Sequence, residues 1–261
     1  MNYKSIFLDI DGTILKPDHT YDESTKDAIN QIMEQRMDVF LATGRPLHEL
    51  DELSEQLGID SFIGYNGAYA VYQNDVILNE PMDRDIIEQY IEISNEYDHE
   101  IVFYTSEKNY FTSLDSPLVK DFIDTFELKK NELFTYDVSE HILGVTVMGL
   151  DETEPTLYEL ESNINLAQVN LEGLTHCYDV IRSNVNKGKA IQRVFDLLDI
   201  TKEQTIAFGD GMNDVEMLQT VGEGFAMANS HPDLFQYAKH KTTSVSDSGI
   251  FNGLQKLGLV K

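Results

Sequence analysis

The chain has 261 residues, an apolar fraction of 41% with 13 Tyr and 13 Phe, and a formal net charge of −27. This composition excludes a disordered chain, and the length suits one large domain or two modest ones. So acidic a protein repels nucleic acid and anionic membrane surfaces, and we expect neither as a partner. An anionic substrate would need a local positive charge, such as a metal ion.

The cysteine content and the N-terminus predict the compartment. Cys177 is the only cysteine, so no intrachain disulfide can form, and we expect it to be a small buried residue. The first residues, MNYKSIFLDI, lack the basic flank and long apolar stretch of a signal peptide. No apolar run reaches the ~18 residues of a membrane span. We therefore expect a soluble cytoplasmic protein, either a monomer or a homodimer.

The N-terminal third alternates short apolar runs with amphipathic segments. The pattern predicts strands at 3–8, 38–42 and 62–64, helices at 24–36 and 46–57, and a hairpin of 68–72 with 76–78 around Asn74-Asp75. Such alternation is typical of a mainly parallel sheet with helices on both faces. We therefore predict an α/β fold whose core is a Rossmann-like, doubly wound parallel sheet.

The middle of the chain has a different pattern, and the alternation then resumes. Helices are expected at 85–97, 119–126 and 155–164, and strands at 101–105, 110–113, 144–148 and near 167 and 175. Beyond them come helices at 187–198, 214–219 and 232–238 and strands at 205–208 and 224–227. This pattern predicts a core formed by 1–81 and 183–261, with an α+β unit inserted at 82–182.

Polar clusters follow three of the predicted core strands. They are DIDGT at 9–13, TGR at 43–45 and GDGMND at 209–214, and Lys187-Gly188-Lys189 begins a predicted helix. Active sites of open parallel sheets lie at the carboxyl ends of the strands, so neighbouring strands would bring all four segments together.

Two of these clusters also fit purely structural roles. A turn with solvated carboxylates remains open for the first cluster, and a helix entry capped by Asn213 remains open for the third. A helix–loop–helix calcium loop starting at Asp9 would need Gly and Glu where the chain has Ile14 and Thr20, so it is excluded.

Four segments resemble the motifs of a known family. DIDGTIL, ATGR, the Lys187-Gly188 helix start and FGDGMNDVEML resemble the four motifs of the haloacid dehalogenase (HAD) superfamily. Their order and spacing, with NGA at 66–68, are similar to those of the Cof-type phosphatases. The resemblance covers essentially the whole chain. It implies a HAD-like catalytic core at 1–81 and 183–261, with 82–182 as a cap of the C2B type that reads the leaving group.

The resemblance implies roles for the acidic residues. A phosphate ester is doubly anionic, and Mg²⁺, a hard cation, takes oxygen ligands and neutralises that charge. The expected ligands are Asp9, Asp210 and the backbone carbonyl of Asp11, with Asp214 binding directly or through water. Asp9 would attack phosphorus, while Asp11 would protonate the leaving alkoxide and then deprotonate water. The dehalogenase and phosphonatase branches lack the acid at position 11, so its presence favours phosphoryl transfer.

The remaining candidates would bind the phosphoryl group. Thr43 can donate its hydroxyl, the N–H groups of Gly44 and the following residues can bind an anion, and Lys187 can supply positive charge. Two further roles are left open, since Arg45 could contact substrate or tie down its loop, and Asn213 could touch phosphate or only cap a helix. Lys189 competes with Lys187, which aligns better with the family pattern.

The leading hypothesis is a magnesium-dependent phosphatase that hydrolyses small phosphorylated metabolites, such as sugar phosphates or phosphorylated cofactors, through an aspartyl-phosphate. A phosphomutase of the same superfamily and a non-catalytic phosphate- or metal-binding module are the alternatives. A phospho-accepting receiver domain fits poorly, because its phosphorylated Asp follows the third strand and its chain is about half as long as this one.

Overall fold

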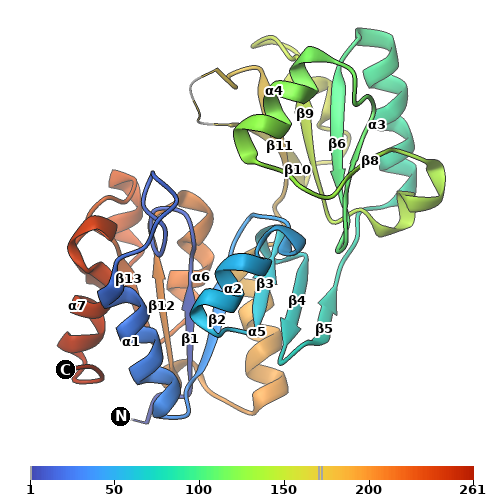
Figure 1. Ribbon diagram of the computed structural model, residues 1–261. Coiled ribbons are helices and arrows are strands. Elements are labelled where there is room, and N and C mark those ends of the chain that lie inside the picture. The colour runs from blue at the N-terminus through green and yellow to red at the C-terminus, as the bar shows by residue number, and fades with distance from the viewer. Residues whose placement is uncertain (1, 170, 172) are drawn as a thin grey trace. The chain divides into compact units, whose positions relative to one another are not determined.

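The computed structural model describes residues 2–169, 171 and 173–261, and the chain divides into two compact units (Figure 1). The first unit contains the chain up to Arg45, Glu52–Asn79 and Val185–Lys261. The second contains Glu80–Asn184 and also Pro46–Asp51, a segment that the sequence pattern assigned to the core.

An eight-stranded sheet forms the centre of the first unit, in the order β14-β13-β12-β1-β2-β3-β4-β5. Its strands are β1 (Ser5–Leu8), β2 (Asp38–Ala42), β3 (Phe62–Gly64), β4 (Tyr69–Tyr72), β5 (Asp75–Asn79), β12 (Thr205–Gly209), β13 (Glu223–Ala226) and β14 (His240–Lys241). The strands from β14 to β3 are parallel, while β4 and β5 are antiparallel. The predicted α/β core with a mainly parallel sheet is confirmed.

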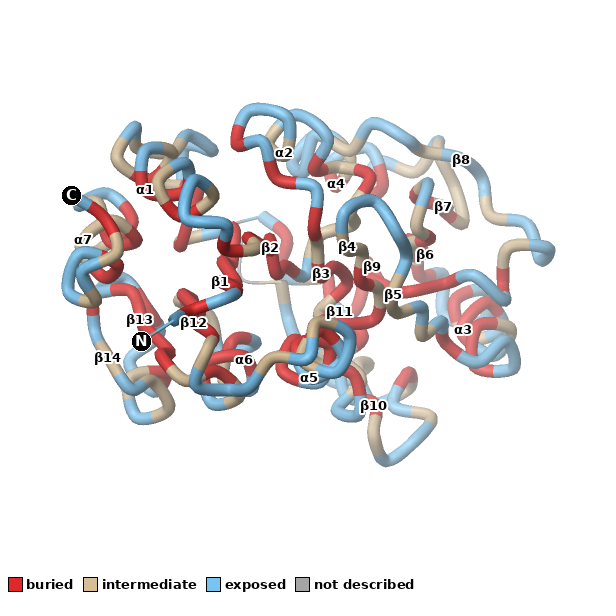
Figure 2. The backbone as a smooth tube through the Cα atoms, turned by 90° about the horizontal axis from the view of Figure 1, so that it is seen from below, coloured by how far each residue is buried: buried red, intermediate tan, exposed pale blue. Residues whose placement is uncertain are grey.

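Helices cover both faces of this sheet. They are α1 (Glu23–Glu34), α2 (Asp51–Leu57), α5 (Lys187–Leu198), α6 (Val215–Thr220) and α7 (Gly249–Lys256). One core cluster joins Phe7 and Ala207 of the sheet to Ile191 of α5 and Met217 of α6. Because both faces are covered, β1, β12 and β13 are buried along their whole lengths (Figure 2). Their sequences therefore do not alternate between apolar and polar residues.

Helix α7 was not predicted, because its two glycines resemble helix breakers in the sequence. Packing explains them: a Cβ on Gly253 would lie 2.4 Å from the Phe208 ring, and one on Gly249 would lie 2.5 Å from the Met227 methyl group. The helix therefore needs glycine to approach the sheet, and tertiary packing overrides its low helix propensity.

A six-stranded sheet forms the second unit, in the order β10-β11-β9-β6-β7-β8. Its elements are α3 (Arg84–Tyr97), β6 (Glu100–Tyr104), β7 (Asn109–Phe111), α4 (Pro117–Phe126), β8 (Asn131–Leu133), β9 (Gly144–Met148), β10 (Ile164–Gln168) and β11 (Cys177–Arg182). One sheet face packs against α3 through Tyr90 and Ile87. The opposite face packs at one end against Val119 and Phe122 of α4. Cys177 is buried there, as expected.

Several predicted helices are shorter than the sequence indicated. The expected helix at 155–164 is a 3₁₀ helix, Pro155–Tyr158, because Ile164 onward pairs as a strand with β11. The helix expected at 46–57 is split into a 3₁₀ helix, Leu47–Glu49, and α2. The side chains of His48 and Glu49 hydrogen-bond to Asn109 of the second unit. The expected helix at 232–238 is also 3₁₀, Pro232–Gln236, and the short strands β8 and β14 were not predicted.

Within the described part of the chain, no helix combines the length and the apolarity that crossing a membrane requires.

Candidate active site

The strand order explains why distant segments meet. Strand β1 lies between β2 and β12, with Leu8 paired to Leu41 on one side and to Phe208 on the other. All three strands are parallel, so the residues that follow them gather at one edge of the sheet. Asp9, Thr43 and Asp210 are the first residues after these strands.

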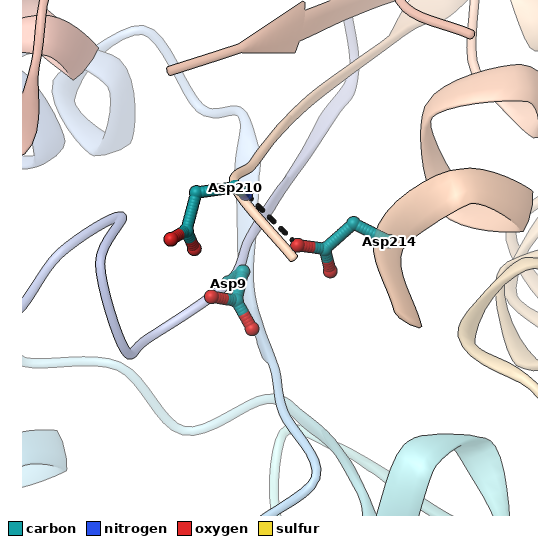
Figure 3. Close-up of side chains that lie close together, drawn as sticks. All are labelled: Asp9, Asp210 and Asp214. Atoms are coloured by element: carbon teal, nitrogen blue, oxygen red, sulfur yellow. Dashed lines mark hydrogen bonds between the residues drawn. The ribbon is translucent and has the colours of Figure 1, made fainter. Parts of the chain in front are cut away.

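Three carboxyl groups converge at this edge (Figure 3). One oxygen each of Asp9, Asp210 and Asp214 lie within 4.8 Å of one another. They come from the ends of β1 and β12 and from the start of α6. The sheet order thus brings Asp9 and Asp210, which are 201 positions apart in sequence, into a single site.

Lys187 lies within the same acidic cluster and is completely buried. Its Nζ donates to Asp9 Oδ1 at 2.6 Å and to Asp214 Oδ1 at 2.7 Å. Burial alone would lower the pKa of Lys187, but the two carboxylates outweigh it and raise that pKa. The ammonium group is therefore held charged. The rival Lys189 is exposed, so the geometry favours Lys187.

Burial also acts on the nucleophile candidate. It raises the pKa of Asp9 well above its usual range, and the neighbouring Asp214 adds to the rise while Lys187 opposes it. One ammonium does not balance three carboxylates. The cluster thus carries an excess of negative charge, which suits a bound cation.

Asp214 organises the loop before α6. Its Oδ2 accepts the backbone N–H groups of Asp210 and Gly211, each at 3.0 Å, while its Oδ1 accepts from Lys187. Both oxygens are therefore engaged with protein groups. The sequence pattern left capping by Asn213 open, but the residue at the start of α6 is Asp214, which makes no side-chain cap hydrogen bond to that helix and instead accepts N–H groups that precede it.

Asp210 is held by residues whose role the sequence did not indicate. Thr13 donates to Asp210 Oδ1 at 3.2 Å, and Asn229 Nδ2 lies 3.4 Å from Oδ2 while donating to the Gly12 carbonyl at 2.8 Å. Gly12 has φ +80°, and a Cβ there would lie 2.1 Å from Asp210 Oδ2. Burial, with repulsion from Asp214, raises the pKa of Asp210 to about 6.

Asp11 has a different environment from the cluster. It is exposed, and the Arg45 guanidinium clamps it, with Nε at 2.7 Å from Oδ2 and Nη2 at 2.5 Å from Oδ1. The sequence left open whether Arg45 contacts substrate or ties down its loop. The structure shows it paired with Asp11, on the loop after the neighbouring strand β1. The buried Thr43 accepts the Arg45 backbone N–H at 3.0 Å and so fixes the turn that carries the arginine.

Gly44 and Asn213 both lie beside Asn66. Asn213 Nδ2 donates to Asn66 Oδ1 at 3.1 Å, and a Cβ on Gly44 would lie 3.1 Å from the same oxygen. Asn66 is left-handed, with φ 54°. The sequence gave NGA at 66–68 only as part of the family resemblance, with no role for Asn66 at the site. Asn229 carried one usable signal, since it follows the end of a predicted core strand.

The donor set fits a hard divalent cation. Three carboxylates offer anionic oxygens within one small space, and Asp9 Oδ2 has no hydrogen bond within the described residues. Mg²⁺ and Ca²⁺ prefer such oxygen ligands, whereas softer metals select sulfur and imidazole. The described histidines and Cys177 take no part in the cluster.

This sheet with its acidic site defines a hydrolase family. The profile of the haloacid dehalogenase-like hydrolases matches residues 6–254. The chain belongs to this family, as the sequence motifs predicted.

Individual relatives agree with this assignment over nearly their full lengths. The chain is 34% identical to the putative phosphatase YkrA of Bacillus subtilis over 264 residues, which is 100% of both proteins. It is 27% identical to the 5-amino-6-(5-phospho-D-ribitylamino)uracil phosphatase YitU of the same organism, over 96% of each chain. Among solved structures, a hypothetical protein of Geobacillus kaustophilus superposes with a TM-score of 0.91 at 29% identity, covering 99% of this chain and 100% of that one.

Proposed function

We propose that this protein is a magnesium-dependent phosphatase that hydrolyses small phosphorylated metabolites through an aspartyl-phosphate. The observation that carries the proposal is the convergence of Asp9, Asp210, Asp214 and Lys187 at the carboxyl ends of β1 and β12. A relative named as a phosphatase of a phosphorylated ribitylamino uracil supports the substrate class, namely sugar phosphates or phosphorylated cofactors.

The cation would be held by Asp9, Asp210 and the backbone carbonyl of Asp11. When bound, Mg²⁺ supplies positive charge that offsets the two charges of the phosphate ester. Asp214 supports this site by fixing the backbone of Asp210 and Gly211 and by sharing Lys187 with Asp9.

Asp9 is the nucleophile in this proposal. Its ionised carboxylate attacks phosphorus, the bond from phosphorus to the ester oxygen breaks, and the alkoxide leaves with a proton from Asp11. Asp11 then takes a proton from a water molecule that attacks the same phosphorus, which releases inorganic phosphate and restores Asp9. Lys187 stabilises the ionised form of Asp9 and the negative charge that develops on the phosphoryl group.

The neighbouring turn binds the phosphoryl oxygens. Thr43 donates its hydroxyl, the Gly44 N–H adds a backbone donor, and Asn213 contributes an amide that Asn66 already orients. Arg45 holds the Asp11 carboxylate beside this turn through two hydrogen bonds. It acts as a positioning residue for the acid and base.

The two units divide the work. Residues 1–81 and 183–261 form the catalytic core, and 82–182 form a cap that selects the leaving group. We propose that the enzyme acts in the cytoplasm, on small phosphorylated molecules rather than on nucleic acid or membranes, as a monomer or a homodimer.

A screen of phosphate esters tests the proposal. We expect the protein to release inorganic phosphate from several esters with Mg²⁺, and a chelator to stop the release. Asp9→Asn should abolish turnover while the circular dichroism spectrum stays unchanged. A protein that transfers phosphate only between sugars, with no release of inorganic phosphate, would instead be a phosphomutase. A protein that turns over no ester would contradict catalysis altogether.

A further inference from the structure

Two turns of the first unit place consecutive residues other than glycine in the left-handed region. Gln73 and Asn74, with φ 49° and 69°, join β4 to β5. Tyr65 and Asn66, with φ 52° and 54°, lie between β3 and β4, and Gly67 continues the run with φ 104°. We call Tyr65–Gly67 the left-handed turn. Asparagine and glycine tolerate this backbone, but a residue as bulky as tyrosine rarely adopts it.

Hairpin geometry explains the first of these turns but not the second. A two-residue hairpin loop such as Gln73-Asn74 favours a type I′ turn, in which both central residues are left-handed. The left-handed turn belongs to a four-residue loop, since Gly64 pairs with Tyr69 across β3 and β4. Loops of that length are most often built around a type I turn, whose central residues are right-handed. Contacts outside the hairpin must therefore hold Tyr65–Gly67 in this conformation.

The first contact joins the left-handed turn to the segment that follows β2. The backbone N–H of Asn66 donates to the Thr43 carbonyl at 3.1 Å, and that of Tyr65 donates to the Arg45 carbonyl at 3.4 Å. A Cβ on Gly44, between them, would lie 3.1 Å from Asn66 Oδ1. The turn therefore fixes the backbone that presents the Thr43 hydroxyl and the Gly44 N–H.

The second contact joins the turn to the start of α5. A Cβ on Gly67 would lie 2.3 Å from the Asn186 carbonyl oxygen and 3.0 Å from the Lys187 nitrogen, so this approach requires glycine. Asn186 caps α5, since its side chain accepts the Lys189 N–H at 2.9 Å. Lys187 is the first residue of α5 and carries the ammonium group that binds Asp9. The turn thus determines how closely the start of α5 approaches segment 43–45.

The third contact is a side-chain bond to the loop before α6. Asn66 Oδ1 accepts a hydrogen bond from Asn213 Nδ2 at 3.1 Å. An amide nitrogen has two protons, so Asn213 keeps one for a phosphoryl oxygen. The Asn213 side chain is exposed, and the bond to Asn66 restricts it to one orientation.

We propose that the left-handed turn is a positioning element of the active site, which sets the spacing between segment 43–45, the start of α5 and the Asn213 amide. Unfavourable backbone conformations persist where the surrounding structure enforces them, and they cluster at functional sites. The inference rests on the proposed function and adds to it the roles of Asn66 and Gly67, neither of which touches the reacting atoms. All three segments serve the phosphoryl group, which every substrate shares, so the effect does not depend on the leaving group.

Asn66→Gly tests the contact with Asn213, because glycine keeps the left-handed backbone and removes the side-chain acceptor. We expect kcat/KM to fall about tenfold, by the same factor for p-nitrophenyl phosphate and glycerol phosphate, as for a displaced binding group. The inhibition constant for inorganic phosphate should rise by a similar factor. Asn74→Gly is the matched control, an exposed left-handed asparagine of the same unit, and should leave both constants unchanged.

A double-mutant cycle shows whether Asn66 acts through Asn213. In the Asn213→Ala background, Asn66→Gly should change kcat/KM by less than about twofold, because the amide that it positions is already absent. If Asn66 had only a structural role, its effect would instead be the same in both backgrounds.

Gly67→Ala tests the contact with α5. The new methyl group would displace the backbone at Asn186, and we expect kcat/KM to fall about tenfold or more. Gly258→Ala is its control, since Gly258 has φ 73° and no atom lies within 4 Å of a Cβ built there. That variant has the same backbone strain without the collision and should keep its activity. Circular dichroism shows whether each variant folds, and the Asn66 cycle decides the inference if Gly67→Ala does not.

Four outcomes would overturn the inference. They are unchanged constants in Asn66→Gly, an equal loss in Asn74→Gly, a fall in kcat/KM for only one of the two esters, and an undiminished effect of Asn66→Gly in the Asn213→Ala background. In each case hydrolysis by the wild type leaves the proposed function standing. A wild-type protein that hydrolyses no ester would instead refute the proposed function, and with it this inference.

Discussion

Two of the first unit's ion-paired groups, both beside the candidate site, differ in burial. Lys187 and its partners Asp9 and Asp214 have side chains that are 0%, 9% and 0% exposed. In the other pair, the side chains of Arg45 and Asp11 are 34% and 53% exposed. A buried charge that loses its partner is costly, whereas an exposed pair adds little to stability. The comparison therefore separates residues that serve both folding and chemistry from residues that serve chemistry alone.

Breaking the buried group should have the largest effect. Lys187→Met keeps most of the side-chain length but leaves Asp9 and Asp214 buried without the ammonium group. We therefore expect a loss of about 3–5 kcal/mol in the free energy of unfolding. Phosphatase activity should fall below detection. Urea unfolding and phosphate release measure the two effects.

Lys189→Met is the control for this prediction. It changes an exposed lysine two residues away on the same helix, and its unfolding free energy should stay within about 0.5 kcal/mol of wild type. Equal losses in the two variants would show that burial of Lys187 has no energetic importance.

Breaking the exposed pair should affect activity without stability. Arg45→Ala frees the Asp11 carboxylate, and we expect kcat to fall about tenfold to a hundredfold, the lower part of the range for a general acid and base. The free energy of unfolding should change by less than about 1 kcal/mol. Arg84→Ala, which breaks the exposed Arg84–Glu88 pair on α3, should leave kcat unchanged. A stable Arg45→Ala variant with full activity would remove Arg45 from the mechanism.

Asn229 contacts the cluster of Asp9, Asp210 and Asp214 without belonging to it. It donates to the Gly12 carbonyl and approaches Asp210, so Asn229→Ala should weaken Mg²⁺ binding about tenfold, as for other residues that orient metal ligands. Isothermal titration calorimetry measures this affinity directly. Asn252→Ala also removes an amide that makes two hydrogen bonds, but away from the cluster, and should leave Mg²⁺ affinity unchanged. Equal affinities in all three proteins would contradict the role of Asn229.

The smallest expected effect concerns His48 of the second unit. Burial lowers the pKa of His48, although its bond to Asn109 and the nearby Glu49 oppose this. The unfolded chain therefore takes up the proton first as the pH falls. The stability that neutral His48 provides is complete above about pH 6.5, its ordinary pKa, and is lost progressively below it.

His48→Gln should remove this titration. The difference in unfolding free energy between wild type and the variant should shrink as the pH is lowered from about 7.5 toward 5. Urea unfolding at a series of pH values measures it, with exposed His141→Gln as the control. A difference that grows at low pH would reverse the sign argued here.

The sequence predicted the core and its carboxylates well, because both depend on local patterns. Apolar runs marked β1, β2 and β12, and the acidic residues directly after them could be assigned to one edge once the strands were taken as neighbours. The features that were missed depend on contacts between distant residues. Asn229 follows the end of a predicted strand, but its contact with Gly12 and the pairing of Arg45 with Asp11 are settled only by the fold.

The second unit was harder to predict for the same reason. The segment at 155–164 has helical spacing, but pairing of β10 with β11 takes its last residue into a strand. The contacts of Thr146 with Tyr104 and Asp179 are also invisible in sequence, since these residues become neighbours only through strand register. Long-range pairing, rather than propensity, decides these elements.

The covalent intermediate offers the most direct test of the proposed chemistry. The enzyme would be mixed with a phosphorus-labelled ester, quenched in acid within one turnover, digested, and its peptides analysed by mass spectrometry. We predict a phosphoryl group on Asp9, labile to hydroxylamine as an acyl phosphate is, and absent from Asp9→Asn. Rapid turnover with no label on Asp9, or with the label on another residue, would contradict the proposed mechanism.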